Sequence, residues 1–357
     1  MYKVLTVTDS QAWQDYLKRL SVVGDEPYVQ AEYLRLYETE TAYAQCFVYE
    51  RGESLAMYPY LKSKVDPQGV LGVGVAGDYY DIEGAYGYNG MLFNTDDLNF
   101  RQEVSHAFMQ YCAQENIIVE WVRLNPLLGQ SAKAEHWQLE KVSQNVIVDL
   151  MMDEDIRFNQ SYLHCVRKNI NQALKSGITI KSIDGGDMNE SWLKAFVEVY
   201  HHTMDRRDSD KKFYFDQEFW HGLAKGLASQ SLFVFALKDQ KVVSCELVLL
   251  GKRNAYSFLG GTLEEFQSLR ANNLLKHELI GNLKNRGLKY YCIGGGRQAN
   301  DGIFRYKAGF AKEGIVDFYI GKAIHDPVVY QQFCAAWDRK YPQKIKTYGK
   351  FFLKYRF

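Results

Sequence analysis

A glycine-rich, cationic stretch at residues 291–310 has side chains suited to binding an anion or stabilising developing negative charge. An apolar segment, 288–293, runs into three consecutive glycines, Gly294, Gly295 and Gly296. Glycines at the carboxyl end of a strand let the backbone approach a ligand and leave N–H groups to face an anion. The cations that follow are Arg297, Arg305 and Lys307. The alternative is a simple turn with solvated basic side chains, because glycine clusters are common in turns.

A second unusual stretch, residues 77–93, contains four glycines, four tyrosines and three acidic residues. Tyr86 and Tyr88 alternate with glycine there. Each tyrosine offers an aromatic face and a hydroxyl group, which suits a binding surface. We therefore predict that both line a substrate site, and the alternative is an ordinary connection between strands.

Composition limits the classes of protein to which the chain can belong. A length of 357 residues favours two domains. Because 43 Lys and Arg balance 43 Asp and Glu, the chain has no bulk positive field for binding DNA. Six scattered cysteines without a CxxC pair indicate reduced thiols and no metal site. The start resembles no signal peptide, and no 18-residue apolar stretch appears. We expect a cytoplasmic protein without an integral membrane segment, at most peripheral to a membrane.

Apolar periodicity predicts the same order of elements in both halves of the chain. The first half has helices over 10–20 and 31–38, a hairpin of 44–50 and 54–62, a helix over 97–116, a strand over 117–124 and a strand pair within 137–150. The second half has a helix over 162–176, a strand over 178–183, helices over 191–204 and 216–228, a meander of 232–237, 242–250 and 255–259, a helix over 270–286 and a strand over 288–293. A strand, a crossover helix and a second strand imply a parallel pair, so each half is a mixed α/β sheet flanked by helices.

This order is typical of the GNAT acyltransferase fold, and local motifs extend the likeness. They are Ala85–Asn89–Gly90, Val148–Asp149–Leu150, Arg167–Lys168–Asn169, Ser176–Gly177–Ile178, Thr203 to Arg206, Asn273–Leu274–Leu275, Gly294–Gly296 and Phe304 to Phe310. In this order, from about residue 40 to 330, they resemble the FemABX group, the aminoacyltransferases of peptidoglycan bridge formation and their relatives. No single motif is specific to that group.

The resemblance implies two GNAT-like domains in tandem that face a shared cleft. The first is 1–150, completed by the aromatic segment 322–357, and the second is 151–321. It also implies an acyltransferase that passes an aminoacyl group, often from aminoacyl-tRNA, to an amine acceptor such as a peptidoglycan precursor of the cell wall. Lys307 lies in the family's Phe-Lys-x-x-Phe pattern, with Tyr306 at the first position, and is the candidate for electrostatic catalysis. Arg206 matches a Thr-x-x-Arg pattern and is a candidate phosphate ligand.

Two other functions remain open. Aminolysis of an ester needs no covalent enzyme nucleophile, and the sequence shows neither a G-x-S-x-G elbow nor a recognisable triad. A CoA-dependent N-acyltransferase is the first alternative, although 267–272 lacks the glycine turn that holds the CoA pyrophosphate. The second is a catalytically silent binding protein. Glu246 interrupts an apolar strand and is either a buried base or a sheet-surface carboxylate. We expect no cofactor for an aminoacyltransferase, and acyl-CoA as the cosubstrate of a CoA-dependent N-acyltransferase.

Overall fold

The computed structural model describes residues 2–74, 77–130, 136–298 and 300–357. Backbone contacts divide the chain into two compact units. Unit 1 comprises Met1–Gly24, Tyr28–Val142 and Tyr319–Phe357, and unit 2 comprises Asp25–Pro27 and Ser143–Phe318. The sequence places the boundaries after residues 150 and 321, whereas the units change within the strands β7 (Gln138–Asp149) and β13 (Ile315–Ile324).

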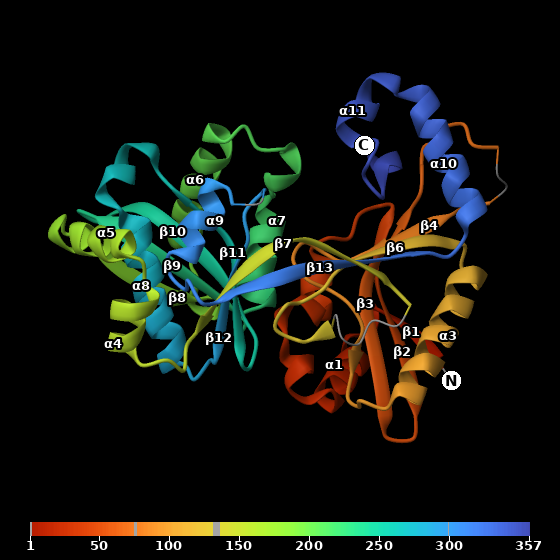
Figure 1. Cartoon of the computed structure of the whole chain (residues 1–357), viewed down its shortest axis with the longest axis horizontal. Coiled ribbons are helices and arrows are strands. Elements are labelled where there is room, and N and C mark those ends of the chain that lie inside the picture. The colour runs from red at the N-terminus through yellow and green to blue at the C-terminus, as the bar shows by residue number, and fades with distance from the viewer. Residues whose placement is uncertain (1, 75–76, 131–135, 299) are drawn as a thin grey trace. The chain divides into compact units, whose positions relative to one another are not determined.

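The strands of unit 1 follow the order β1–β2–β3–β4–β6–β13 (Figure 1). Their bounds are β1 Tyr2–Thr6, β2 Ala42–Arg51, β3 Ser54–Lys64, β4 Tyr80–Glu83 and β6 Ile117–Arg123, and the short β5 (Leu92–Phe93) pairs with β3. Neighbours are antiparallel except β4 and β6, which are parallel and joined through helix α3 (Leu98–Gln114). Asp97 caps α3 by accepting a hydrogen bond from the Asn99 N–H, and Phe100, Val104 and Phe108 fill the core.

Two further segments complete unit 1. Helices α1 (Ser10–Arg19) and α2 (Ala31–Arg35) follow β1, and α10 (Pro327–Lys340) and α11 (Ile345–Tyr348) follow β13. The residues after β13 build a core of their own with β6, in which Phe333, Trp337 and Tyr355 are buried. Part of the aromatic segment at 322–357 is thereby removed from water, while Phe351 and Phe357 stay exposed.

The strands of unit 2 follow the order β7–β12–β11–β10–β9–β8. Their bounds are β8 Thr179–Asp184, β9 Ser231–Lys238, β10 Lys241–Leu250, β11 Asn254–Thr262 and β12 Tyr290–Gly294. The meander β9–β10–β11 is antiparallel, and β11 and β12 are parallel across helix α8 (Ala271–Asn285). The predicted meander and crossover are therefore confirmed.

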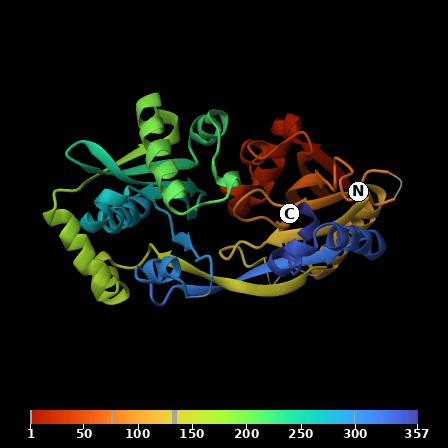
Figure 2. The ribbon, with the colours of Figure 1, turned by 90° about the horizontal axis from the view of Figure 1, so that it is seen from above.

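Helices cover both faces of this sheet (Figure 2). On one face, α8 and α5 (His164–Lys175) share a core with Leu232, Val234 and Tyr291. On the other, the Phe196 ring of α6 (Glu190–Arg206) packs edge-on against Phe233. The alternation of strand side chains separates the two cores.

Several predicted elements differ from the structure. Residues 138–149 form one long strand instead of a strand pair, because no turn interrupts them. The helix predicted over 216–228 is the short α7 (Gln217–His221) followed by a π-helical turn, Gly222–Gly226, where two glycines weaken a regular helix. The lysine-bearing segment after the glycines is the helix α9 (Gly302–Ala308).

Candidate active site

The parallel strands β11 and β12 separate at the centre of unit 2. They are paired only at Asn254–Tyr290, Ala255–Tyr291 and Tyr256–Cys292, although β11 continues to Thr262. The β10–β11 register shifts between Leu247 and Val248, so that Phe258 is the extra residue of a bulge. Bulges increase the local twist of a strand. Beyond Tyr256, β11 therefore departs from β12, and the ends of both strands are the natural place for a ligand.

The ammonium group of Lys307, a residue of α9, lies at the end of β12. Its Nζ donates a hydrogen bond to the Gly295 carbonyl oxygen at 2.8 Å. Gly294 has a φ of +79°, and a Cβ there would lie 3.3 Å from this Nζ. The left-handed turn at Gly294 thus brings the chain around the ammonium group. One of three ammonium donors is used, and the structure gives this group no other hydrogen bond among the described residues.

The other two glycines are required by close internal contacts. A Cβ on Gly295 would lie 2.4 Å from the Gln144 carbonyl oxygen, and one on Gly296 would lie 2.3 Å from Asp301 Oδ1. Asp301 Oδ2 accepts hydrogen bonds from the backbone N–H groups of Arg297 and Gln298 at 2.6 and 3.1 Å. These two N–H groups already have an anionic partner. The expectation of free N–H donors concerned the glycines themselves, and the predicted ligand contacts of Gly295 and Gly296 stay predictions.

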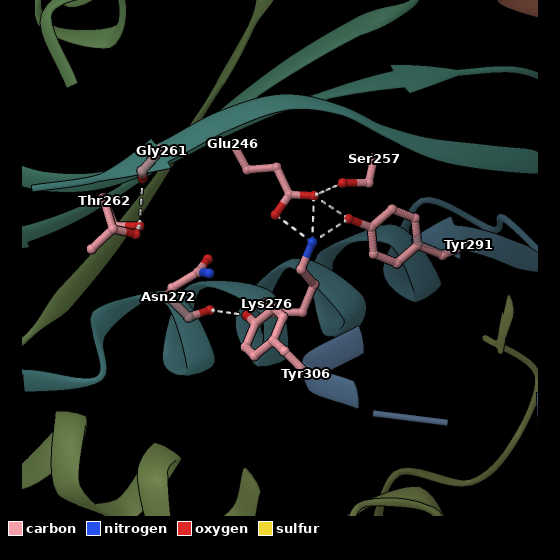
Figure 3. A network of polar contacts seen from close by, with 9 residues as sticks. Glu246, Ser257, Gly261, Thr262, Asn272, Lys276, Tyr291 and Tyr306 are labelled. Atoms are coloured by element: carbon pink, nitrogen blue, oxygen red, sulfur yellow. Dashed lines mark hydrogen bonds and ion pairs between the residues drawn. The ribbon is translucent and has the colours of Figure 1, made fainter. Parts of the chain in front are cut away.

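A buried polar network, drawn in Figure 3, includes the two residues Lys276 and Glu246 whose charges act on Lys307. Lys276 Nζ of α8 donates to both carboxylate oxygens of Glu246 and to the Tyr291 hydroxyl, the last at 2.9 Å. The Tyr291 and Ser257 hydroxyls both donate to Glu246 Oε1, the second at 2.7 Å. Glu246 and Lys276 are 5% and 3% exposed. Because three donors occupy the carboxylate, Glu246 is the counterion of Lys276 and not a free base.

Burial and a neighbouring cation act on Lys307. Burial, followed by the positive charge of Lys276, lowers the pKa of Lys307 from 10.5 to about 8, and Cys292, Glu246 and Asp301 oppose this shift. Burial likewise lowers the pKa of Lys276, against the attraction of Glu246. With both ammonium groups protonated, the cluster of Lys307, Lys276 and Glu246 carries two positive charges and one negative charge. A bound anion would neutralise the excess.

The two residues of the Thr-x-x-Arg pattern, Thr203 and Arg206 on α6, form hydrogen bonds with the end of β11. Thr203 Oγ1 accepts a hydrogen bond from the Thr262 N–H at 3.0 Å, and Arg206 Nη1 donates to the Thr262 carbonyl oxygen at 2.9 Å. With its amide oxygen turned toward Arg206, Gln267 accepts from both terminal nitrogens at 2.9 and 3.2 Å. Arg206 thus positions the segment between β11 and α8, and its predicted phosphate contact stays a prediction.

Arginines gather near this strand end. Partial burial and the positive charges of Arg297 and Arg206 lower the pKa of Arg207, while Asp301 opposes the shift. The Arg305 guanidinium donates to the Asn300 carbonyl oxygen at 2.5 Å. In the described part of the chain, none of these four arginines lies within 4.0 Å of a carboxylate oxygen. Positive charges that crowd one another in this way are typical of an anion site.

The tyrosine–glycine stretch lies in unit 1. The Tyr86 carbonyl oxygen accepts a hydrogen bond from the Tyr33 hydroxyl, and the residue Tyr86 is 41% exposed. The half-buried Tyr88 ring packs edge-on against Tyr28 at 5.4 Å. A Cβ on Gly87 would lie 2.3 Å from the Tyr28 ring, so this glycine allows close packing. The role of Tyr86 and Tyr88 in substrate binding stays a prediction.

Sequence reasoning missed two residues of the site. Lys276 shares the buried face of α8 with Leu275 and Leu279, and a lysine within an apolar helical face is the signal that could have identified it. Arg207 directly follows Arg206 in the sequence, and only the fold brings it near Arg297. Across the described ranges, no group of three or more His, Cys, Asp or Glu side chains is arranged to hold a metal ion.

The site lies in a segment that matches a known family. Residues 161–308 match the model of the acetyltransferase (GNAT) domain. The crystal structure of FemX has a similar fold, with a TM-score of 0.66 and 13% sequence identity over 93% of this chain and 99% of that one. A tandem GNAT protein from the clavulanic acid biosynthesis pathway has a TM-score of 0.53 and 9% identity, covering 92% of this chain and 99% of its own.

A third solved structure is the C-terminal domain of a lysylphosphatidylglycerol synthetase candidate from Agrobacterium fabrum. Its TM-score is 0.55 and its identity 13%, over 93% of this chain and 96% of that one. No curated protein matches the chain in sequence. The likeness in fold and the domain match confirm the predicted resemblance to FemABX and GNAT proteins, the α/β fold class and the acyltransferase class.

Proposed function

Starting from an acyltransferase with a GNAT domain in unit 2, we propose that the chain transfers an aminoacyl group from aminoacyl-tRNA to an amine acceptor, a peptidoglycan precursor. The observation that carries the proposal is the position of Lys307, a largely buried ammonium group at the end of β12, in the unit that also holds the crowded arginines. Phosphate groups of the donor, and the oxyanion formed during transfer, are anions of the kind such a site stabilises.

The reaction follows from elementary acyl chemistry. The neutral amine attacks the ester carbonyl carbon, a C–N bond forms, and the carbonyl oxygen gains negative charge in the tetrahedral intermediate. The C–O bond then breaks, the tRNA hydroxyl leaves with a proton, and the amine loses one. Lys307, as the cation, lowers the energy of the oxyanion by up to about 3 kcal/mol. The charges of Lys276 and Glu246 act on the pKa of Lys307 in opposite directions.

A donor with exposed phosphates suits the arginines better than a CoA pyrophosphate does. The turn before α8 has no glycine at 267–272, and Arg270 occupies its left-handed position, with a φ of +60°. A side chain there restricts the close backbone approach that a pyrophosphate needs. CoA nevertheless remains the second candidate donor, because the matching family model describes an acetyltransferase domain.

Calorimetry with acetyl-CoA and a transfer assay with aminoacyl-tRNA and a soluble peptidoglycan precursor test the proposal together. We expect no acetyl-CoA binding tighter than millimolar, and amide formation from aminoacyl-tRNA. Lys307→Met, which keeps the stem and removes the charge, should reduce the rate about a hundredfold with a nearly unchanged melting temperature.

Two outcomes would contradict the proposal. A micromolar Kd for acetyl-CoA with amide formation from it would establish the CoA-dependent reaction instead. If Lys307→Met instead melts several degrees lower while its rate stays within about threefold of the parent, Lys307 is a structural residue. Lys175→Met, at an exposed position on α5, is the matched control for loss of one lysine charge.

A further inference from the structure

The distribution of charge in the chain is uneven at one place. Although the whole chain has a formal net charge of zero, residues 339–357 contain no Asp or Glu. They contain seven basic residues, Arg339, Lys340, Lys344, Lys346, Lys350, Lys354 and Arg356. We call residues 339–357 the basic segment. It lies in unit 1 and includes α11.

Not all of these charges are used within the fold. Lys354 pairs with Asp338 at 2.7 Å, and Arg356 pairs with Asp81 and Glu83. Arg339, Lys346 and Lys350 are exposed, and the structure gives them no ion pair with any described carboxylate. Three cations therefore face water on one short segment.

The same segment exposes apolar side chains between these cations. Ile345, Phe351 and Phe357 are 43%, 48% and 41% exposed. The Phe351 ring packs edge-on against Phe357 at 5.2 Å, and Phe357 stacks on Tyr348 at 4.8 Å. Lysines flanking exposed phenylalanine and isoleucine form the pattern of an interfacial membrane contact, in which apolar groups enter the headgroup region and cations meet anionic lipid phosphates.

The geometry favours a bilayer over a nucleic acid as the occupant. Base stacking on a protein needs open aromatic faces. Here Tyr348 and Phe357 cover one face of each other at an interplanar angle of 16°, and Ile345 has no ring on which a base could stack. Among the described residues, no helix is long and apolar enough to span a membrane, so the contact would lie in the interface plane.

We propose that the basic segment docks unit 1 on the surface of an anionic phospholipid bilayer, with Phe351, Phe357 and Ile345 inserted and Lys346 and Lys350 at the lipid phosphates. The basic segment belongs to unit 1, whereas the candidate active site belongs to unit 2. The proposal does not depend on the acyl donor or acceptor.

Sedimentation with vesicles tests it without an activity assay. The full chain should bind vesicles of phosphatidylcholine with about 30 mol% phosphatidylglycerol, should bind pure phosphatidylcholine far more weakly, and should be released by salt. Because each lysine contributes about fivefold, the double variant Lys346→Glu, Lys350→Glu should bind at least ~25-fold more weakly. Phe351→Ser should also weaken binding, with little change in salt dependence.

The control double variant Lys168→Glu, Lys175→Glu makes the same change of charge on exposed positions of α5 and should bind as the parent does. Absence of vesicle binding by the parent at low salt would overturn the proposal, as would equal loss in the control. The proposal would also be overturned if the parent bound single-stranded RNA but not vesicles, and if the Lys346→Glu, Lys350→Glu variant lost the RNA binding. That result would identify a nucleic acid as the partner. Since transfer activity is not measured, failure here leaves the proposed reaction untouched.

Discussion

The parallel strand pairs of the two units differ in how they end. In unit 2, β11 leaves β12 after Tyr256. In unit 1, β4 is paired with β6 along its whole length, and Asn89 then continues the contact. The Asn89 N–H donates to the Arg123 carbonyl oxygen at 2.9 Å, and Asn89 Oδ1 accepts from the Arg123 N–H at 2.8 Å. The same crossover topology thus gives a closed pair in unit 1 and an open pair in unit 2.

The buried carboxylates of the two pairs differ accordingly. Glu120 of β6 is fully buried and accepts a hydrogen bond from the Tyr58 hydroxyl at 3.0 Å. The Nε2 atoms of His136 and His325 lie 3.1 and 3.2 Å from its Oε1. Burial alone would raise the pKa of Glu120, but the two imidazoles hold it well below its usual range.

In unit 1 the partners of Glu120 come from separate segments of the chain that enclose the core. Ser105 lies 3.1 Å from His136 Nδ1, but Ser105 is buried within α3 and inaccessible as a nucleophile. In unit 2, Glu246 holds a lysine of the crossover helix next to a second lysine at the strand end. A carboxylate of the same kind therefore supports stability in the first unit and a charged site in the second.

The largest effect is expected from breaking the buried pair of unit 2. Lys276→Met leaves Glu246 buried without its cation, which should lower the free energy of unfolding by about 3–5 kcal/mol in urea titrations. The double variant Lys276→Met, Glu246→Gln should recover most of this loss, because the amide oxygen still accepts from Ser257 and Tyr291. A double variant as unstable as the single one would show that the charge pair is not the cause.

The corresponding break in unit 1 should be somewhat smaller. Arg356→Gln removes the cation beside the buried Asp81, but the Tyr355 hydroxyl still donates to Asp81 at 2.9 Å. We expect about 3 kcal/mol of destabilisation by thermal or urea unfolding. Lys354→Gln, which removes the neighbouring pair with Asp338, should cost less than about 1 kcal/mol. Equal costs for the two variants would contradict the importance of burial at Asp81.

The pH dependence of transfer should sharpen the role of the open pair. If the Lys307 cation is required, activity should fall about tenfold per pH unit above its pKa of about 8, because the neutral amine lacks the charge. Lys307→Arg stays charged and should lose this falling limb, even with a lower maximal rate. A falling limb that persists in Lys307→Arg would assign the titration to another group.

The smallest effect concerns the closure of unit 1. Asn89→Ala removes the side-chain acceptor of the Arg123 N–H and should cost about 1–2 kcal/mol. Rates of transfer should change less than threefold, because unit 2 keeps its open strand end. The check combines a melting curve with the transfer assay. A large loss of activity without a loss of stability would instead place this stretch, with Tyr86 and Tyr88, at a substrate.

Sequence periodicity predicted the meander, the crossovers and the parallel pairs, because these depend on local patterns of apolar residues and on the glycine that ends α8, Gly287, with a φ of +81°. It located the end of β12 to within one residue for the same reason. It did not predict that Asp301 binds the N–H groups of Arg297 and Gln298, or that Lys276 neutralises Glu246. Those contacts join residues whose distance is set by packing and not by spacing along the chain.

The discontinuity of unit 1 has a consequence for biosynthesis. Asp81 is buried against Tyr355 and Arg356, more than 270 residues later in the chain. When residues 1–142 leave the ribosome, this carboxylate has no partner, and the apolar face that α10 covers is open. Unit 2, nearly all of it continuous, can complete its sheet first. Unit 1 can therefore reach its native state only after residues 319–357 have been made, and until then its uncovered apolar surface favours aggregation.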